Sequence, residues 1–334
     1  MTEWLEQAGI AVIPLPTPFM VGPVNVYVIK GDPPLLIDVG PLMDEAYDKL
    51  VKRLDRLGYR LTDIGGILLT HDHIDHGGQL GRVLAESGAE AWAHPHAVAH
   101  LAAYDDRKDE ALARFTALMR ELGASGEDLD IIIQDRIDDS GFAAGAQIQH
   151  TLSDGQSVHG FRVHFVPGHS ASDVLFVRED LGLAFSGDHV LKAINPSPLL
   201  RIPLEGETRG KALVELRHSF EHTRSLALRC LCPGHGDPFD GHGAIIDKLL
   251  SRHERRNKQV FGLLEEGPKT PFELARTLFP DLEMIHMYLG LSVATAHCEL
   301  LEERGRVLSH HQDGVLHYAA VTEAQASHER SERH

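Results

Sequence analysis

The chain has 334 residues, 43% of them hydrophobic, which is enough to bury one large domain and a small one. Its formal net charge of −17 disfavours non-specific binding to nucleic acid or to anionic membranes. Its cysteines, Cys230, Cys232 and Cys298, are too few for a disulfide framework, and Cys230 and Cys232 are predicted to be core residues of one strand. No signal peptide or membrane-crossing run is visible, so we expect a soluble, cytoplasmic protein with no membrane partner.

The first informative element is a short apolar strand, 65–70, that ends in the sequence His-Asp-His-Ile-Asp-His at 71–76. This run places three imidazoles and the carboxylate of Asp75 within six residues. A strand that stops in such a cluster delivers ligands to one point in space, and imidazole and carboxylate groups suit Zn²⁺ and similar metals. The run therefore predicts a metal site.

Residues 96–149 are predicted to form a helical insertion. Apolar side chains recur at helical spacing over 99–122, and 128–139 fits a second short helix after a glycine-rich break. Two roles stay open for this insertion. It is either a structural decoration or a lid that presents side chains such as Phe115 and Met119 to the substrate pocket.

Three later apolar strands repeat one pattern, in which a glycine precedes a ligand candidate: His169, Asp188 and His235. Glycine lets the backbone turn sharply and approach a metal closely. A single histidine in such a place is more often an ordinary core or surface residue, but the recurrence of the pattern favours one shared site. We interpret Ser170, Ser172 and Asp173 as loop residues that support the neighbouring ligand.

The stretch 189–198 directly follows Asp188 and is therefore expected to line or rim the site. His189, Lys192 and Asn195 are candidates for contact with a carboxylate, a phosphate or an acyl oxygen of the substrate. Loop scaffolding is the alternative for each of the three.

Residues 250–320 predict a small additional domain. Helices are expected at 252–264 and 289–304, a capped helix start at 270–273, and a hairpin around Asp313-Gly314. This segment contains eight Lys or Arg and ten Asp or Glu, for a net charge of −2, so it lacks the basic footprint of a nucleic-acid-binding domain. We expect it to pack against the catalytic domain or to support a homodimer.

The candidate ligands together resemble those of the metallo-β-lactamase superfamily, on its glyoxalase II-like branch: His71, His73, Asp75, His76, His169, Asp188 and His235. Residues 25–29 and 35–40 also match the first hairpin of that family, and the resemblance spans about residues 10–245. It implies an α/β fold, an αββα sandwich with the metals at one edge between two sheets. The segment 250–320 is similar to the winged-helix appendage of some members, including the endoribonuclease β-lactamase-like protein 2.

The resemblance also implies a role for each ligand: a first metal held by His71, His73 and His169, a second held by Asp75, His76 and His235, and a bridge formed by Asp188. Asp38 would orient the ligand loops. Two divalent metal ions are expected as cofactors, with Zn²⁺ as the default and Fe or Mn left open. Because this set is complete, we do not expect His94, His96 or His100 to be ligands.

The ligand types favour a hydrolase within that superfamily. Common zinc β-lactamases carry cysteine in place of Asp188, flavodiiron oxidases usually carry glutamate in place of His73, and persulfide dioxygenases use a single iron. We therefore expect a dinuclear hydrolase in which a metal-bridged hydroxide attacks a small carboxylic-acid derivative, a thioester, ester or lactone. Asp75 and Asp188 would hold the metals and accept a hydrogen bond from the nucleophile.

Two alternatives to this function stay open. A small metal-dependent endoribonuclease or phosphodiesterase is the first, by analogy with the winged-helix relative, and the acidic charge argues against it. A non-catalytic or redox module is the second, but it would show missing ligands, which this sequence does not. The expected domains are a catalytic domain at 1–249 that carries the insertion 96–149, a winged-helix-like domain at 250–320 and a flexible tail at 321–334.

Overall fold

The computed structural model describes residues 2–203 and 209–321, and the chain divides into two compact units. The first unit contains the described residues up to 109 together with 137–196 and 215–247. The second contains 110–136, the described part of 197–214, and residues 248–321. The expected linear domain boundaries remain a prediction, and residues 322–334 of the expected tail lie outside the described part.

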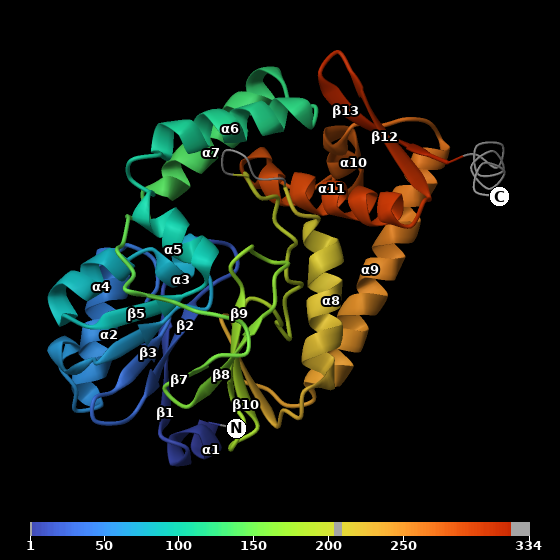
Figure 1. Cartoon of the computed structure of the whole chain (residues 1–334). Coiled ribbons are helices and arrows are strands. Elements are labelled where there is room, and N and C mark those ends of the chain that lie inside the picture. The colour runs from blue at the N-terminus through green and yellow to red at the C-terminus, as the bar shows by residue number, and fades with distance from the viewer. Residues whose placement is uncertain (1, 204–208, 322–334) are drawn as a thin grey trace. The chain divides into compact units, whose positions relative to one another are not determined.

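Two sheets form the frame of the first unit (Figure 1). The six-stranded sheet follows chain order: β1 (Ile10–Leu15), β2 (Val24–Ile29), β3 (Leu35–Ile37), β4 (Gly66–Leu68), β5 (Glu90–Ala93) and β6 (His150–Thr151). The five-stranded sheet has the order β11 (Cys230–Pro233), β10 (Leu183–Gly187), β9 (Val174–Arg178), β8 (Phe161–Phe165) and β7 (Ser157–Val158). Strands β3 to β6 are parallel, as are β10 and β11, so several strands end at the same edge of their sheet.

The alternation of side chains along the strands separates two cores. On β2, Val26 and Val28 pack with Leu50 of helix α2 (Asp44–Arg56) on the helix-covered side of the first sheet. Tyr27, between them in sequence, faces the second sheet and packs at 4.9 Å from Phe185 of β10. Successive strand residues point to opposite faces, which is why one strand serves both cores. Cys230 and Cys232 lie in the core between the sheets, as the sequence predicted.

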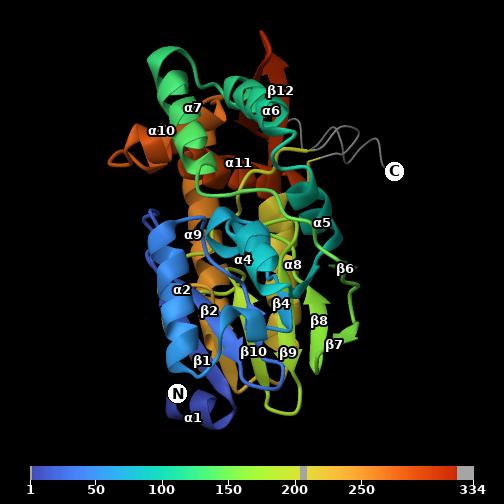
Figure 2. The same ribbon diagram turned by 90° about the vertical axis from the view of Figure 1, so that its left-hand side faces the viewer.

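Helices lie on the outer faces of both sheets, as Figure 2 shows for α2, α4 and α8. The helices that contribute to this unit are α1 (Thr2–Gln7), α2 (Asp44–Arg56), α3 (Ile74–Gly77), α4 (Leu80–Ser87), α5 (Pro95–Ala102) and α8 (Ala212–Ser225), with the short turn η1 (Leu61–Asp63). α8 contacts the loop that follows β8 of the second sheet: the hydroxyl of Ser219 donates a hydrogen bond to the carbonyl oxygen of Pro167 at 2.8 Å. This unit is therefore the expected mixed α/β sandwich.

The second unit consists of segments that are distant in sequence. Its elements are α6 (Lys108–Glu121), α7 (Gly126–Ser140), α9 (His242–Glu265), α10 (Pro271–Leu278), η2 (Met284–His286), α11 (Met287–Glu303), β12 (Val307–Gln312) and β13 (Val315–Ala320). Three of these helices, α6, α7 and α9, begin or end in the first unit. Phe115 and Met119 of α6 are buried in one core with Leu274 and Leu291 from the C-terminal segment. Both side chains were named as candidates for the wall of a substrate pocket. That expectation is wrong for them, because their apolar face is covered by this core.

The C-terminal segment contains the elements that its sequence predicted. Thr270 and Glu273 form a reciprocal capping box at the start of α10. Asp313 and Gly314 both have positive φ, 52° and 80°, as a two-residue hairpin turn between β12 and β13 requires. α9 begins at His242, well before the predicted start. Among the described residues, no helix is long and apolar enough to cross a membrane. The winged-helix assignment itself stays a prediction.

Candidate metal centre

The first four candidate ligands lie at a strand-to-helix turn. β4 ends at Leu68, an irregular segment with a bend at Thr70 leads to His73, and α3 then begins at Ile74. His71 and His73 therefore precede the helix, whereas Asp75 and His76 lie on its single turn. This abrupt change of direction gathers ligands that a straight strand would send to opposite faces.

The other three ligands follow strands of the second sheet: His169 after β8, Asp188 after β10 and His235 after β11. The glycines before them are required by geometry. Gly187 has φ of 47°, in the left-handed region. A Cβ at Gly234 would lie 2.4 Å from Oδ1 of Asp188 and 2.5 Å from Cε1 of His76, so no side chain fits there.

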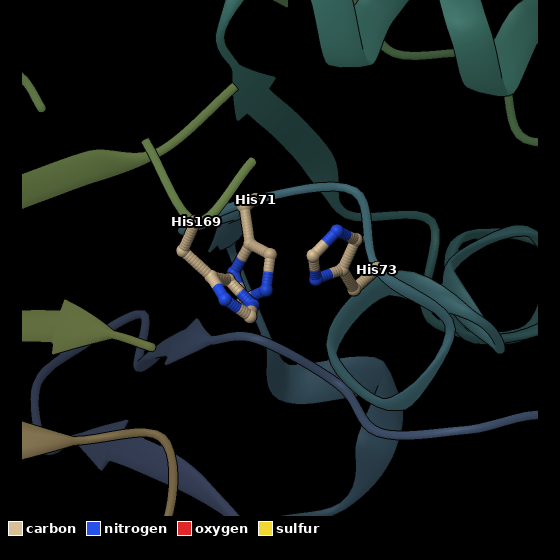
Figure 3. Close-up of side chains that lie close together, drawn as sticks. All are labelled: His71, His73 and His169. Atoms are coloured by element: carbon tan, nitrogen blue, oxygen red, sulfur yellow. The ribbon is translucent and has the colours of Figure 1, made fainter. Parts of the chain in front are cut away.

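The structure brings all seven predicted ligands together in three overlapping groups. In each group the candidate ligand atoms lie within 4.8 Å of one another: His71, His73 and His169; His71, His76 and Asp188; and Asp75, His76 and His235. Figure 3 shows the first group, in which imidazoles from the loop after β4 and the loop after β8 come close together. Ring centroids lie 4.5 Å apart for His73 and His169. All seven belong to the first unit.

The cluster has two halves: the three-histidine half consists of His71, His73 and His169, and the other half consists of Asp75, His76 and His235. Asp188 lies between these two halves. Its Oδ1 is 3.3 Å from Nε2 of His76, and its Oδ2 is 3.6 Å from Nε2 of His169 and 3.5 Å from Nε2 of His235. Asp75 approaches the same Nε2 of His235 at 3.2 Å. One carboxylate thus faces histidines of both halves, which is the position required of a bridging ligand.

Residues behind the imidazoles fix their orientation. Nδ1 of His76 lies 2.8 Å from Oδ2 of Asp38, and Nδ1 of His235 lies 2.9 Å from the carbonyl oxygen of Pro23. Asp38 also accepts hydrogen bonds from the backbone N–H and the hydroxyl of Thr70. With Nδ1 engaged on the outside, each ring presents Nε2 to the centre, which is the usual arrangement of metal-binding histidines.

The residues present fit divalent metal ions. Nε2 of His71 is buried and makes no hydrogen bond with any described residue. Leaving a buried polar atom without such a partner is costly, and a metal ion would remove that cost. The donor set of imidazole nitrogens and carboxylate oxygens suits Zn²⁺, Fe or Mn.

The two halves differ in their electrostatics. Burial lowers the pKa of His71 well below its usual value and that of His73 to about 3, so both imidazoles keep a free lone pair. Burial also acts to lower the pKa of His76, but Asp188, Asp38 and Asp75 raise it well above its usual value. The surroundings of His76 therefore attract positive charge strongly, while His71 and His73 supply neutral donors.

The three residues that were predicted to contact substrate, His189, Lys192 and Asn195, differ in their burial. His189 is fully buried, with Nε2 at 2.8 Å from the hydroxyl of Thr223 and its ring against Phe220, and burial lowers its pKa to about 3. This position fits its scaffolding alternative. Lys192 and Asn195 are exposed, and their contact with substrate stays a prediction.

His94, His96 and His100, which the sequence does not predict to be ligands, belong to none of the three ligand groups. Nδ1 of His94 accepts a hydrogen bond from the backbone N–H of His96 and caps α5. His100 pairs instead with Asp72, a residue that sequence reasoning passed over. Its place between two ligands was the signal that could have drawn attention to it.

The fold and this cluster define a class of metal-dependent hydrolase, and comparison with known proteins names the family. Residues 20–235 match the model of the metallo-beta-lactamase superfamily, and the chain belongs to that superfamily. It is 29% identical over 314 residues to the probable metallo-hydrolase YqjP of Bacillus subtilis, a match that covers 92% of this chain and 97% of that protein. It is therefore a metal-dependent hydrolase.

Other relatives are more distant or match a smaller part. An atrochrysone carboxyl ACP thioesterase of Aspergillus fumigatus is 31% identical over 150 residues, which is 40% of this chain and 44% of that protein. The crystal structure of a metallo-beta-lactamase family protein from Thermus thermophilus is similar with a TM-score of 0.78 and 25% identity, covering 94% of this chain and 99% of that one. A beta-lactamase domain protein from Burkholderia ambifaria has the same fold, with a TM-score of 0.78 at 23% identity, covering 94% and 92%.

Proposed function

We propose that the protein is a dinuclear hydrolase of a small carboxylic-acid derivative, a thioester, an ester or a lactone. The observation that carries this proposal is the position of Asp188, whose two oxygens face histidines of both halves of the cluster. A single-metal enzyme would have no use for a second complete group at Asp75, His76 and His235. Zn²⁺ is the proposed metal, since imidazole and carboxylate ligands suit it.

The candidate ligands form two sets, one for each ion. His71, His73 and His169 would hold one, while Asp75, His76 and His235 would hold the other, with Asp188 between them. Two bound divalent ions supply an activated water and a polarised carbonyl oxygen. Asp75 and Asp188 keep negative charge beside both positions and can accept a hydrogen bond from the attacking water. The tight packing at Gly234 keeps these ligands in place.

Charge and similarity support a carbonyl substrate over a polyanion. The chain has a net charge of −17 and its segment 250–320 a net charge of −2, whereas binding to nucleic acid depends on cations that displace counterions from phosphates. The relative from Aspergillus is named as a thioesterase, which acts on a carboxylic-acid derivative. For the C-terminal segment we propose a winged-helix-like fold that serves packing or dimerisation, since its acidic third helix, α11, carries Glu299, Glu302 and Glu303.

The test is an activity panel with the Zn²⁺-loaded protein. An acyl thioester, a lactone, an aryl ester and a single-stranded RNA would be compared, with Asp188→Ala as the control for contaminating activity. We expect hydrolysis of at least one carbonyl substrate and no salt-sensitive binding of RNA at micromolar protein. RNA cleavage that disappears in Asp188→Ala, with no carbonyl hydrolysis, would instead establish the endoribonuclease function.

A further inference from the structure

Asp72 lies between the ligands His71 and His73 in sequence, yet it belongs to none of the three ligand groups. Its side chain is only 7% exposed. Oδ1 accepts a hydrogen bond from the hydroxyl of Ser172 at 2.5 Å, and Oδ2 lies 2.6 Å from Nδ1 of His100. A buried carboxylate with two such partners is a fixed structural element, because its hydrogen bonds are charge-assisted and poorly screened by solvent.

These contacts join three separate pieces of the chain. Asp72 lies on the loop after β4, His100 on α5, and Ser172 on the loop that also carries His169. The link to that loop is double, because the backbone N–H of Asp72 also donates to the hydroxyl of Ser172 at 3.1 Å. The loop is braced internally, since the hydroxyl of Ser170 donates to Asp173 at 2.9 Å. Asp72 therefore ties together the two loops that supply the three-histidine half.

The other half of the cluster has supports of its own. Asp38 orients His76, and the carbonyl of Pro23 orients His235. Neither of these contacts involves Asp72. The two halves are thus held by different residues, although Asp38 also reaches His71 through the hydroxyl of Thr70, at 2.7 Å and then 3.1 Å.

We propose that Asp72 is a positioning residue that sets the metal affinity of the three-histidine half selectively. It holds His71 and His73 in register with His169 by clamping their loop to Ser172, with His100 fixing the second carboxylate oxygen. The inference rests on the metal centre proposed above. Metal content of the unaltered protein tests that centre, whereas the ratio of affinities between the halves tests the role of Asp72.

The experiment isolates each half before Asp72 is changed. His235→Ala leaves the three-histidine half, and His73→Ala leaves the half that contains Asp75. Zn²⁺ affinity would be measured in each background by competition with a chromophoric chelator, with and without Asp72→Asn. We expect roughly 10–100-fold weaker binding in the first background, the range for loss of a residue that orients metal ligands. In the second background we expect no change.

Glu90→Gln is the matched control for removal of a carboxylate beside an imidazole. Oε2 of Glu90 lies 3.0 Å from Nε2 of His150, an exposed pair that touches no ligand loop. This substitution should leave both affinities unchanged. Equal weakening of both halves by Asp72→Asn would reduce Asp72 to a general stability role and overturn the proposal, as would unchanged affinity of the three-histidine half.

Two further variants keep the test decisive if Asp72→Asn fails to fold. His100 is 37% exposed, so changes there are tolerated more easily. His100→Ala should weaken the three-histidine half, and His100→Asn should restore it, because the amide nitrogen of asparagine occupies the place of Nδ1. The visible absorption of Co²⁺ bound to that half should shift in His100→Ala and return in His100→Asn. Failure of His100→Asn to restore affinity and spectrum would count against the proposal.

Discussion

Oδ2 of Asp38 lies 2.8 Å from Nδ1 of His76, on the opposite side of the ring from Nε2, which faces Asp188 at 3.3 Å. The imidazole is thereby held between a supporting carboxylate and a candidate ligand carboxylate. Asp38 reaches this place from the end of the first hairpin, with φ of 60°. The orientation of a ligand in the second half thus depends on a residue far from it in sequence.

Replacing that support should weaken metal binding without abolishing it. Asp38→Asn removes the charge and one acceptor behind His76, and we expect a loss of roughly 10–100-fold in metal affinity. Competition with a chelator measures the change. Asp63→Asn, which alters an ion pair with Arg60 and the cap of the short turn η1 but no member of a ligand group, is the control and should have no effect. Full affinity in Asp38→Asn would show that the ring is held by packing alone.

The protein should bind two metal ions per chain, because both halves of the cluster are complete. Elemental analysis of protein purified without chelator, then reloaded with excess Zn²⁺ or Mn²⁺, gives the number. Removal by chelator should abolish hydrolysis, and addition of the metal should restore it. One tightly held ion, with no second under excess metal, would contradict the dinuclear centre.

Asp188→Ala should remove most of the activity. The substitution deletes the carboxylate that faces both halves and leaves adjacent cations less neutralised, so we expect a loss on the order of 10²-fold or more in kcat. His94→Ala, by contrast, removes the cap of α5 and a ring contact with Phe165 but no member of a ligand group, and it should leave kcat nearly unchanged. Steady-state kinetics of both variants provides the comparison. Equal losses would mean that the ligand assignment is wrong.

Phe115 should matter for stability and not for substrate choice. It is buried in the core of the second unit, 5.5 Å from the ring of Tyr288, so Phe115→Ala should cost about 3–5 kcal/mol in the free energy of unfolding of that unit. Denaturant unfolding measures this cost, with the exposed Leu308→Ala as control. A change in substrate preference without loss of stability would restore the lid hypothesis.

The cluster of candidate ligands could be predicted from sequence because its members lie shortly after the ends of apolar strands, and three of the seven, His169, Asp188 and His235, directly follow a glycine. Such local patterns can be recognised in the sequence without any knowledge of tertiary contacts. The sandwich was implied by the resemblance that these residues carry. The capping box at Thr270 and the turn at Asp313 were predictable for a related reason, since both are set by a few neighbouring residues.

What sequence could not supply were contacts between distant segments. The partnership of Asp72 with Ser172 and His100 depends on how two loops and a helix converge. The burial of Phe115 depends on a C-terminal core that its own helical pattern does not reveal. Periodicity shows that a helix has an apolar face, but it does not say which other segment covers that face.

The second unit is assembled from the middle of the chain and from its C-terminal segment, and this has a consequence for its synthesis. The apolar faces of α6 and α7 emerge from the ribosome long before α10 and α11 exist to cover them. During that interval the nascent chain exposes Phe115 and Met119 to water, and exposed apolar side chains promote aggregation. The candidate ligands, by contrast, have all been synthesised once the ribosome passes residue 235. The metal centre can therefore assemble before the last helix of the second unit, α11, has been synthesised.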